Sequence, residues 1–279
     1  MTVLVGVLLA AACAAPVAAP VVDRTLTLPS ASGDRVAVVH RGTTAAPGAP
    51  LVVVLHGAGG TAADVQASLG WDGLADRAGL VVAYPDGLDR TWNAGRCCGP
   101  ARDRGVDDVA YLDALVASLR GSDGVGPLYA VGFSNGAMMS YAWACARPGE
   151  LAGIGPVAGA LLVDCPAPAP LTVVTVHGTA DARVPIGGGP GPSGTPFPSL
   201  DDSLAPFRSA AGCAADAALN DASPAQVATW ACTEGRTVVR DVVHGLPHTW
   251  PGAGPMAGTS DGPLDATGFL WTHLHGAAA

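Results

Sequence analysis

Short apolar runs alternate along the chain with segments of helical periodicity. Residues 61–78 predict one helix, and apolar positions that recur every three or four residues between 106 and 119 predict another. Because strand-like runs and helical segments alternate after an opening antiparallel pair, the pattern predicts an α/β fold with a mainly parallel, twisted sheet and helices on both faces. The runs typical of strands lie at residues 25–28, 36–39, 51–55, 80–84, 128–131, 171–177 and 236–243.

A Gly-x-Ser-x-Gly pentapeptide occupies residues 132–136, between the apolar run 128–131 and the helix-compatible segment 137–143. A strand, a sharp turn and a helix form the context in which this pattern is a nucleophile elbow. The turn holds the serine in a strained conformation, and the flanking glycines let neighbouring backbone approach closely. The pattern therefore predicts that Ser134 is a nucleophile at the carboxyl edge of the sheet.

Asp181 and His248 are the predicted partners of this serine. A serine nucleophile needs a base and an acid that orients the base, and in sheets of this kind the chain order is Ser, Asp or Glu, then His. Asp181 follows the apolar run 171–177, and His248 lies in a loop rich in glycine and proline after the run 236–243. Both residues therefore have the position that this order requires.

Other histidines compete with His248 for the role of the base. His56 precedes the serine and His177 ends an apolar run, so we expect both to be structural. His244 is the closest rival, because it lies only four residues before His248, but it directly abuts the run 236–243. We therefore predict His248 as the base and keep His244 as the alternative.

Other aspartates have structural interpretations. Asp164 follows an earlier strand-like segment and is an alternative acid. Asp201 and Asp202 begin a predicted helix, where we expect them to act as caps. Asp107 and Asp108 precede another helical pattern, and we expect them to be capping or first-turn residues.

An oxyanion hole should combine the backbone N–H of Asn135 with one from the loop after the strand at 51–55. That loop is the His-Gly-Ala-Gly-Gly run at 56–60. It carries almost no side chains, so a backbone N–H can come close to a substrate. We predict Ala58 as the second donor, with Gly59 as the alternative.

Two tryptophans lie close to the predicted site along the chain. Trp250 comes two residues after His248, and Trp92 lies in a glycine-rich loop. Both are candidates for an apolar acyl or aromatic subsite. Packing in the core explains either of them equally well.

The charge composition excludes several kinds of site. All 14 cationic residues are Arg, which excludes a Ser–Lys dyad, a Schiff-base lysine and a phosphate-binding P-loop. The net charge of −9 and the sequence pI near 5.0 argue against nucleic acid or an anionic membrane as partner. No Cys/His spacing typical of zinc sites is present, so we expect no metal and no cofactor.

The first residues have the pattern of an export signal. Residues 3–12 form an apolar run too short to span a bilayer, followed by small residues and proline, although no Arg or Lys precedes it. We predict that residues 1–22 are a signal peptide or a lipoprotein leader, with cleavage after Ala19 and a lipid anchor on Cys13 as alternatives. We expect the protein to be secreted or held at the cell surface as a lipoprotein.

Cysteine usage agrees with export. Besides Cys13 the chain has an even number of cysteines, which predicts up to three disulfides. We predict a Cys213–Cys232 bridge, which closes a loop of about 20 residues. Neighbouring Cys97 and Cys98 should take separate partners, because a ring between adjacent cysteines is strained. Cys145 and Cys165 complete the set, and the sequence leaves the partners of these last four cysteines open.

Several motifs in order resemble one family, over about residues 24–275. They lie at 55–60, 84–87, 92–99, 106–109, 132–139, 177–181 and 248–252. Together they resemble the polyhydroxybutyrate depolymerase-like secreted esterases, a group that includes feruloyl esterase-like and lipoprotein members. This resemblance implies an α/β-hydrolase fold without a large cap domain and a triad of Ser134, Asp181 and His248.

These observations predict a secreted serine carboxylic-ester hydrolase with one catalytic domain over residues 23–279. Its expected substrate is a polyhydroxyalkanoate-type polyester or oligomer, or a related ester, and the alternative is a feruloyl or acetylxylan ester of a plant polysaccharide. A serine peptidase and a non-catalytic surface-binding protein are more remote alternatives. We expect the protein to act as a monomer on a small or polymeric ester.

Overall fold

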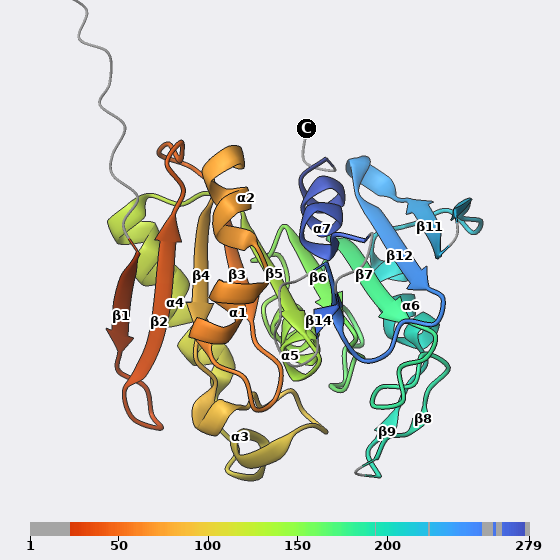
Figure 1. Cartoon of the computed structure of the whole chain (residues 1–279), viewed down its shortest axis with the longest axis horizontal. Coiled ribbons are helices and arrows are strands. Elements are labelled where there is room, and N and C mark those ends of the chain that lie inside the picture. The colour runs from red at the N-terminus through yellow and green to blue at the C-terminus, as the bar shows by residue number, and fades with distance from the viewer. Residues whose placement is uncertain (1–22, 193, 223, 253–258, 261–263, 277–279) are drawn as a thin grey trace, which may run out of the picture.

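A ten-stranded sheet runs through the described part of the chain (Figure 1). The structure is a computed structural model that describes residues 23–192, 194–222, 224–252, 259–260 and 264–276. The predicted leader, including Cys13, lies outside the described residues. From one edge to the other, the strands are β1 (Arg24–Leu28), β2 (Arg35–Arg41), β4 (Val81–Pro85), β3 (Leu51–Leu55), β5 (Leu128–Phe133), β6 (Gly153–Val157), β7 (Thr172–Gly178), β12 (Thr237–Val243), β11 (Ala225–Ala231) and β10 (Ala218–Ala222).

Strand direction divides the sheet into a parallel centre and antiparallel edges. Neighbouring strands from β4 through β3, β5, β6 and β7 to β12 pair in parallel. The strands β1 and β2 at one edge, and β11 and β10 at the other, run antiparallel to their neighbours. Parallel strands covered on both faces read as continuous apolar runs, which is why these segments were visible in the sequence. The predicted fold class is confirmed.

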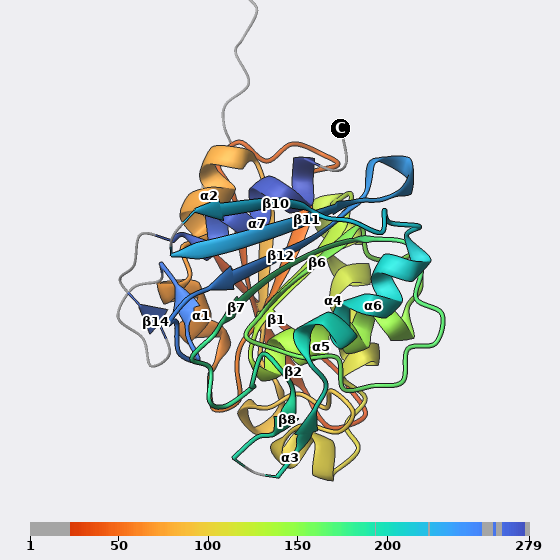
Figure 2. The ribbon, with the colours of Figure 1, turned by 90° about the vertical axis from the view of Figure 1, so that its right-hand side faces the viewer.

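Helices cover both faces of this sheet, as the edge-on view in Figure 2 shows. Helices α1, α2 and α7 pack on one face, and α4, α5 and α6 pack on the other. No helix in the described ranges combines the length and the apolar character that a membrane crossing needs. The helices are α1 (Ala62–Ser68), α2 (Trp71–Ala78), α3 (Gly99–Asp103), α4 (Asp108–Asp123), α5 (Asn135–Ala146), α6 (Leu200–Ala210) and α7 (Ala266–His275), with the 3-10 turns η1 (Leu88–Arg90) and η2 (Thr233–Gly235).

The strands supply side chains to two cores, one on each face. Along β3, Leu51, Val53 and Leu55 belong to the core that α4 and α5 cover, whereas Val52 and Val54 belong to the core beneath α1, α2 and α7. This division follows from the alternation of side chains along a strand. All five side chains are fully buried. The central strands therefore form a rigid support for the loops at their ends.

The single helix predicted over residues 61–78 is wrong, because the segment forms two helices. α1 ends at Ser68 and α2 begins at Trp71, and Gly70 between them has φ 74°. This left-handed conformation interrupts helical hydrogen bonding, and glycine adopts it without a Cβ clash. The start of α1 was correctly placed, since the Thr61 side chain accepts the N–H of Asp64 in a capping box.

The carboxyl ends of the parallel strands lie together at one edge of the sheet, the lower one in Figure 1. Phe133 at the end of β5 is in register with Val157 of β6, and Gly178 at the end of β7 is in register with Val243 of β12. Helix α3 and the short ribbon of β8 (Gly189–Pro190) and β9 (Pro196–Phe197) flank this edge. A second ribbon pairs β13 (Trp250–Pro251) with β14 (Thr259–Ser260). Loops from distant parts of the chain therefore meet there.

Candidate active site

Ser134 occupies a tight turn between β5 and α5. Its backbone has φ 54° and ψ −115°, and its N–H donates to the carbonyl oxygen of Val157 at 2.9 Å. A Cβ at Gly136 would collide with the carbonyl oxygens of Leu55 and His56. A positive φ is costly for serine, so the surrounding contacts must hold the residue in this conformation. The turn has the geometry expected of a nucleophile elbow.

The predicted nucleophile, base and acid are connected by hydrogen bonds. His248 Nε2 lies 2.9 Å from Ser134 Oγ, and His248 Nδ1 lies 2.8 Å from Asp181 Oδ2. Because an ionised carboxylate only accepts hydrogen bonds, Nδ1 carries the proton and Nε2 is free to accept the Ser134 hydroxyl. This arrangement prepares His248 to remove a proton from Ser134.

Asp181 is held as a buried carboxylate. Its Oδ1 accepts the backbone N–H groups of Arg183 at 2.9 Å and Val184 at 2.8 Å. Burial alone would raise the pKa of Asp181, but hydrogen bonds from His177, His248 and the Val184 N–H outweigh this effect and lower the pKa well below its usual range. Asp181 therefore stays ionised and can stabilise a protonated His248.

Asn135 is the first residue of α5, where a backbone N–H has no acceptor within the helix. Its side chain is fully engaged elsewhere, because Oδ1 accepts the N–H of Trp92 at 2.7 Å and Nδ2 donates to the carbonyl oxygen of Trp92 at 3.0 Å. These two bonds fix the start of α5 against the loop that carries Trp92. The Asn135 N–H also lies at the positive end of the helix dipole, which favours a negative charge there.

Two backbone N–H groups of the loop at 56–60 are already paired. Gly59 donates its N–H to the carbonyl oxygen of Arg90 at 2.8 Å, and Gly60 donates to Gly57 at 2.9 Å. Among the described residues, no hydrogen-bond acceptor pairs with the N–H of Ala58 or of Asn135. The geometry therefore favours the predicted donor Ala58 over its alternative Gly59.

The His56 side chain holds the start of this loop in place by two hydrogen bonds. Its Nε2 accepts the N–H of Gly87 at 2.8 Å, so its Nδ1 carries the proton and donates to the carbonyl oxygen of Gly57 at 2.8 Å. The side chain is fully buried, and burial lowers the pKa of His56, which keeps the ring neutral. His56 thus has the structural role that the sequence suggested.

The rival catalytic residues lie away from this hydrogen-bonded chain. His244 is exposed, and its backbone N–H donates to Pro224. Asp164 is exposed as well. The N-cap of α6 is Ser199, so Asp201 and Asp202 lie in the first turn of the helix rather than at its cap. The hydroxyl of Ser199, two residues before Asp201, takes the capping position, which corrects the sequence interpretation.

Asp107 and Asp108 take the expected places at the start of α4. Asp107 is the N-cap and accepts the N–H of Ala110 at 2.9 Å. Asp108 is buried, pairs with Arg35 at 2.9 Å and accepts the N–H of Asn93 at 2.7 Å. Its ion pair fixes the loop before α3 and has no contact with Ser134 or His248 in the structure.

Trp92 and Trp250 are buried in the core rather than displayed to a substrate. Their exposed fractions are 0% and 1%. Trp92 donates its indole N–H to the carbonyl oxygen of His56 at 2.9 Å and so supports the oxyanion loop from below. The structure therefore favours core packing over the predicted subsite role for both residues, because neither ring has a free surface.

Three cysteine pairs are bonded in the described part of the chain. Cys213 is joined to Cys232, the pair that the sequence favoured, and Cys145 is joined to Cys165. The expectation of separate partners for Cys97 and Cys98 is wrong in this structure, which bonds them to each other. The peptide bond between them is cis, and their Cα atoms lie 3.0 Å apart.

Sequence reasoning missed a contact surface beside the oxyanion loop. The ring of Phe133 lies 4.9 Å from the His248 ring and is tilted by 38°. Phe133 also lines a cavity of about 340 Å³ with Asp64, Val65, Arg90 and the loop residues 57–60. The position of Phe133 directly before the nucleophile was the only signal in the sequence that pointed to it. The cavity adjoins Ala58 and so lies beside the predicted oxyanion donor.

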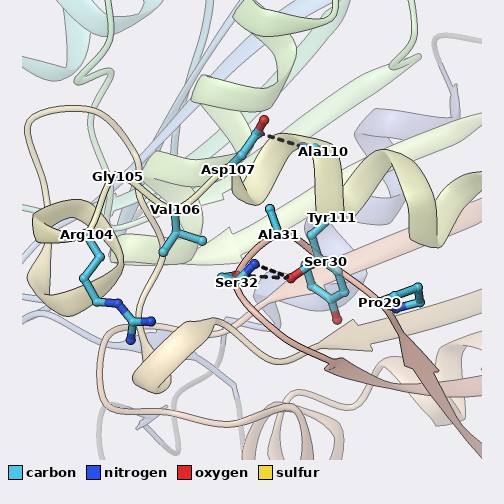
Figure 3. Close-up of a pocket in the computed structure, with 10 residues that line it drawn as sticks. All are labelled: Pro29, Ser30, Ala31, Ser32, Arg104, Gly105, Val106, Asp107, Ala110 and Tyr111. Carbon is cyan, nitrogen blue, oxygen red and sulfur yellow. Dashed lines mark hydrogen bonds between the residues drawn. The ribbon is translucent and has the colours of Figure 1, made fainter.

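A larger cavity of about 540 Å³ lies elsewhere (Figure 3). It is formed by the turn Pro29–Ser32 between β1 and β2, the segment Arg104–Asp107, and Ala110 and Tyr111 of α4. None of the predicted catalytic or oxyanion residues lines it. Size alone therefore does not identify the functional cavity in this protein.

One cluster in the described chain has side chains close enough to hold a metal ion. The ligand atoms of Asp23, His40 and Asp72 lie within 4.8 Å of one another. Nδ1 of His40 lies 2.7 Å from Asp23, and Nε2 lies 3.3 Å from Asp76. Burial would lower the pKa of His40, but hydrogen bonds and charges from Asp23, Asp72 and Asp76 raise it overall. Hydrogen bonds between the His40 ring and the carboxylates of Asp23 and Asp76 account for the cluster.

The chain is similar in sequence to several proteins named as esterases. It is 36% identical over 150 residues to the esterase NocK of Nocardia uniformis subsp. tsuyamanensis, which covers 50% of this chain and 42% of that protein. Feruloyl esterase C of Emericella nidulans is 32% identical over 147 residues, and the match covers 50% of this chain and 51% of that protein. Poly(3-hydroxyalkanoate) depolymerase C of Paucimonas lemoignei is 32% identical over 117 residues, and the match covers 40% of this chain and 28% of that protein. The chain thus spans about half or less of the length of these relatives. No family model matches.

Solved structures share the architecture. An acetyl xylan esterase from Aspergillus awamori superposes with a TM-score of 0.61 at 14% identity, covering 88% of this chain and 99% of that one. An α/β serine hydrolase homologue from Coxiella burnetii superposes with a TM-score of 0.50 at 18% identity, covering 81% of this chain and 88% of that one. The chain has the α/β-hydrolase fold. The superpositions support the fold alone, and the sequence relatives agree with the resemblance to esterases.

Proposed function

We propose that this protein is a serine carboxylic-ester hydrolase that works through an acyl-enzyme. The observation that carries the proposal is the hydrogen-bonded chain from Asp181 through His248 to Ser134. Two backbone N–H groups without an acceptor among the described residues support it: that of Ala58 in the loop after β3 and that of Asn135 at the start of α5. Relatives named as esterases agree with this activity.

The first half of the reaction acylates the enzyme. Ser134 Oγ attacks the ester carbonyl carbon while His248 Nε2 takes the hydroxyl proton. The carbonyl oxygen becomes an oxyanion, which accepts hydrogen bonds from the N–H groups of Ala58 and Asn135. When the carbon–oxygen bond to the alcohol breaks, His248 returns its proton to the leaving alkoxide. Asp181 stabilises the imidazolium throughout.

The second half releases the acid. Water attacks the carbonyl carbon of the acylated Ser134, and His248 removes a proton from that water. The second tetrahedral intermediate uses the same two N–H groups. Its collapse frees the carboxylic acid and returns the proton to Ser134 Oγ.

The cavity beside Ala58 and Phe133 gives room for a medium-sized group of the ester. Its volume is about 340 Å³, and its walls combine Val65, Phe133 and glycine backbone with the charged Asp64 and Arg90, so they offer apolar and polar contacts to an ester. We propose a polyhydroxyalkanoate-type polyester or oligomer as the first substrate class. A feruloyl or acetylxylan ester is the second, because feruloyl esterase C is among the similar proteins.

We also propose that residues 23–279 act as one exported, monomeric catalytic domain. The apolar run at 3–12 and the bonded cysteine pairs support export, because disulfides persist in oxidising compartments. A lipid on Cys13 would hold the protein at the cell surface. Mass analysis of the mature amino terminus distinguishes lipidation at Cys13 from cleavage after Ala19.

Hydrolysis of p-nitrophenyl acetate and butyrate, measured beside an aminoacyl nitroanilide, tests the activity. We expect ester turnover and no amide turnover, with Ser134→Ala as the blank. A second panel of hydroxybutyrate oligomers, methyl ferulate and acetylated xylan ranks the substrate classes. Amide turnover comparable to ester turnover, or no turnover of any ester, would overturn the proposal.

A further inference from the structure

A second histidine contacts the acid of the proposed triad. His177 lies near the end of β7 and is only 2% exposed. Its Nε2 lies 2.8 Å from the carbonyl oxygen of Val184 and 3.4 Å from Asp181 Oδ2. The same Oδ2 accepts the hydrogen bond from His248 Nδ1 at 2.8 Å. Two imidazole rings therefore share one carboxylate oxygen.

The proton on His177 can be assigned from its partners. A carbonyl oxygen only accepts hydrogen bonds, so the Nε2 that faces Val184 must carry hydrogen. That N–H is directed at Val184, and Asp181 Oδ2 is its second, more distant acceptor. His177 thus acts as a donor toward the carboxylate and cannot compete with His248 for the role of a base.

We propose that His177 is a positioning residue of the catalytic centre, which holds Asp181 and limits how strongly Asp181 favours the protonated form of His248. The inference rests on the proposed ester hydrolysis. His177 fixes both ends of the segment 181–184, since it contacts the Asp181 carboxylate and the Val184 carbonyl. It also draws part of the negative charge of Oδ2 toward itself.

The other charged groups near this pair are few in the described chain. Arg183 contributes its backbone N–H to Asp181 Oδ1, and the residue is exposed. On the neighbouring strand β12, Arg240 pairs with Asp201 at 2.5 Å, and Asp241 is in register with Val176 rather than with His177. His177 is therefore the polar side chain that acts on Asp181 besides His248 itself.

Removal of this donor should have a distinctive consequence. Without the His177 N–H, the Asp181 carboxylate interacts more strongly with the imidazolium form of His248. His248 then loses its proton only at higher pH, so the acid limb of the kcat/KM profile moves to higher pH. The rate at the optimum falls as well, because Asp181 is held less firmly. A hydrogen bond to a charged group corresponds to about tenfold to a hundredfold in rate.

Three variants separate positioning from simple packing. His177→Leu fills similar space without a donor. His177→Asn keeps a polar amide whose shorter side chain does not reach Val184 and Asp181. His177→Gln places an amide N–H close to the position of the histidine Nε2 and is the conservative rescue. His244→Ala is the matched control, because it removes an exposed histidine outside the site.

Two readouts are measured on the full-length protein, with thermal unfolding to verify the fold. The first is the pH profile of kcat/KM for p-nitrophenyl butyrate, and the second is the rate at which a fluorophosphonate probe labels Ser134. We expect His177→Leu and His177→Asn to lose about tenfold to a hundredfold in both, with the acid limb moved to higher pH. His177→Gln and His244→Ala should retain the wild-type limb and most of the rate.

The result that overturns the proposal is an unchanged acid limb and labelling rate in folded His177→Asn or His177→Leu. A loss in His177→Gln as large as in His177→Asn overturns it too. If both the Leu and Asn variants fail to fold while His177→Gln keeps the wild-type rate and limb, the rescue by an N–H donor supports the proposal. If wild type hydrolyses no ester but still labels at Ser134, the proposed function fails and the labelling rates alone decide the role of His177.

Discussion

The backbone N–H of Gly59 donates to the carbonyl oxygen of Arg90 at 2.8 Å, and this bond selects which part of the oxyanion loop is free. Asp89 and Arg90 have φ values of 47° and 62°, so a left-handed turn aims that carbonyl at the loop. Because the N–H of Gly59 is paired, we propose the N–H of Ala58 as the oxyanion donor of this loop. A contact with a distant segment thus sets the loop together with the hydrogen bond between Gly60 and Gly57 inside it.

The first prediction concerns this donor. Ala58→Pro removes the N–H and should reduce kcat for p-nitrophenyl butyrate by about a hundredfold to a thousandfold, the usual effect of losing one oxyanion donor. Ala58→Gly keeps the N–H and should stay within a few-fold of wild type. Thermal unfolding verifies that both variants fold. If a folded Ala58→Pro variant kept the full kcat, another residue would have to supply the oxyanion donor.

A second prediction tests the nucleophile. Ser134→Ala should lower kcat by about 10⁶, because members of a triad act as a unit, while the far-UV spectrum and melting temperature stay close to wild type. Stopped-flow and end-point ester assays cover this range. Retention of more than a few per cent of activity would contradict the elbow assignment.

The third prediction separates the two neighbouring histidines. His248→Ala should be nearly as damaging as the loss of Ser134, since His248 bonds both Ser134 and Asp181. His244→Ala should retain most turnover, because His244 is exposed and outside the site. Ester hydrolysis rates of both variants test this prediction. A larger loss in His244→Ala than in His248→Ala would show that His244 is the base.

A fourth prediction uses the buried carboxyl of Asp241. Its Oδ1 has no hydrogen-bond partner among the described residues, and burial raises the pKa of Asp241 from 3.8 to about 6. Because the folded protein binds this proton more tightly than the unfolded chain, the contribution to stability is fully present below pH 3.8 and is lost as pH rises through about 6. The ionised form is therefore the destabilising one at neutral pH.

Asp241→Asn cannot ionise, so it should be more stable than wild type at pH 7 by on the order of 3 kcal/mol. This gain should shrink toward zero near pH 4. Urea unfolding at both pH values measures it. The exposed Asp216 provides the control, since Asp216→Asn should show no such pH dependence. Equal stability of Asp241→Asn and wild type at pH 7 would show that the carboxyl is not destabilising.

The fifth prediction concerns the cysteines. Thiol titration under denaturant should find no free thiol among the six cysteines after residue 13, and peptide mapping should recover Cys213 joined to Cys232. The double variant Cys213→Ser/Cys232→Ser should lose about 3 kcal/mol of unfolding free energy, as expected for a loop of this length. Six free thiols in the mature protein would contradict both the pairing and export.

Cys97 and Cys98 show where sequence reasoning had too little information. The strain of a ring between adjacent cysteines argued for separate partners. The path of the backbone between Trp92 and Gly99 decides instead, since the Trp92 main chain is held by Asn135 and the Cys97 carbonyl accepts the N–H of Ala94. The contact between Trp92 and Asn135 joins residues that are far apart in the sequence, so a local pattern does not contain it.

The sequence by itself determined the nucleophile and the order of its partners. A Cβ at Gly132 would collide with the backbone of Gly136 within the turn itself, so this part of the requirement is local to the Gly-x-Ser-x-Gly pattern, whereas a Cβ at Gly136 would collide with Leu55 and His56 of another segment. Strand-like runs before Asp181 and His248 then place both residues at the carboxyl edge of a parallel sheet. These features are local in the chain, or follow from strand order, and a single sequence contains them.

Only the tertiary structure decided which side chains touch across the sheet edge. The carbonyl oxygen of Arg90 accepts the N–H of Gly59, whereas the N–H of Ala58 has no acceptor among the described residues. The side chains of Trp92 and Trp250 are buried in the core. His177 reaches Asp181 because the chain turns back at the end of β7, although both residues look like ordinary strand and loop positions in the sequence. Hydrogen bonds and burial depend on distances between segments, and those distances exist only after the chain has folded.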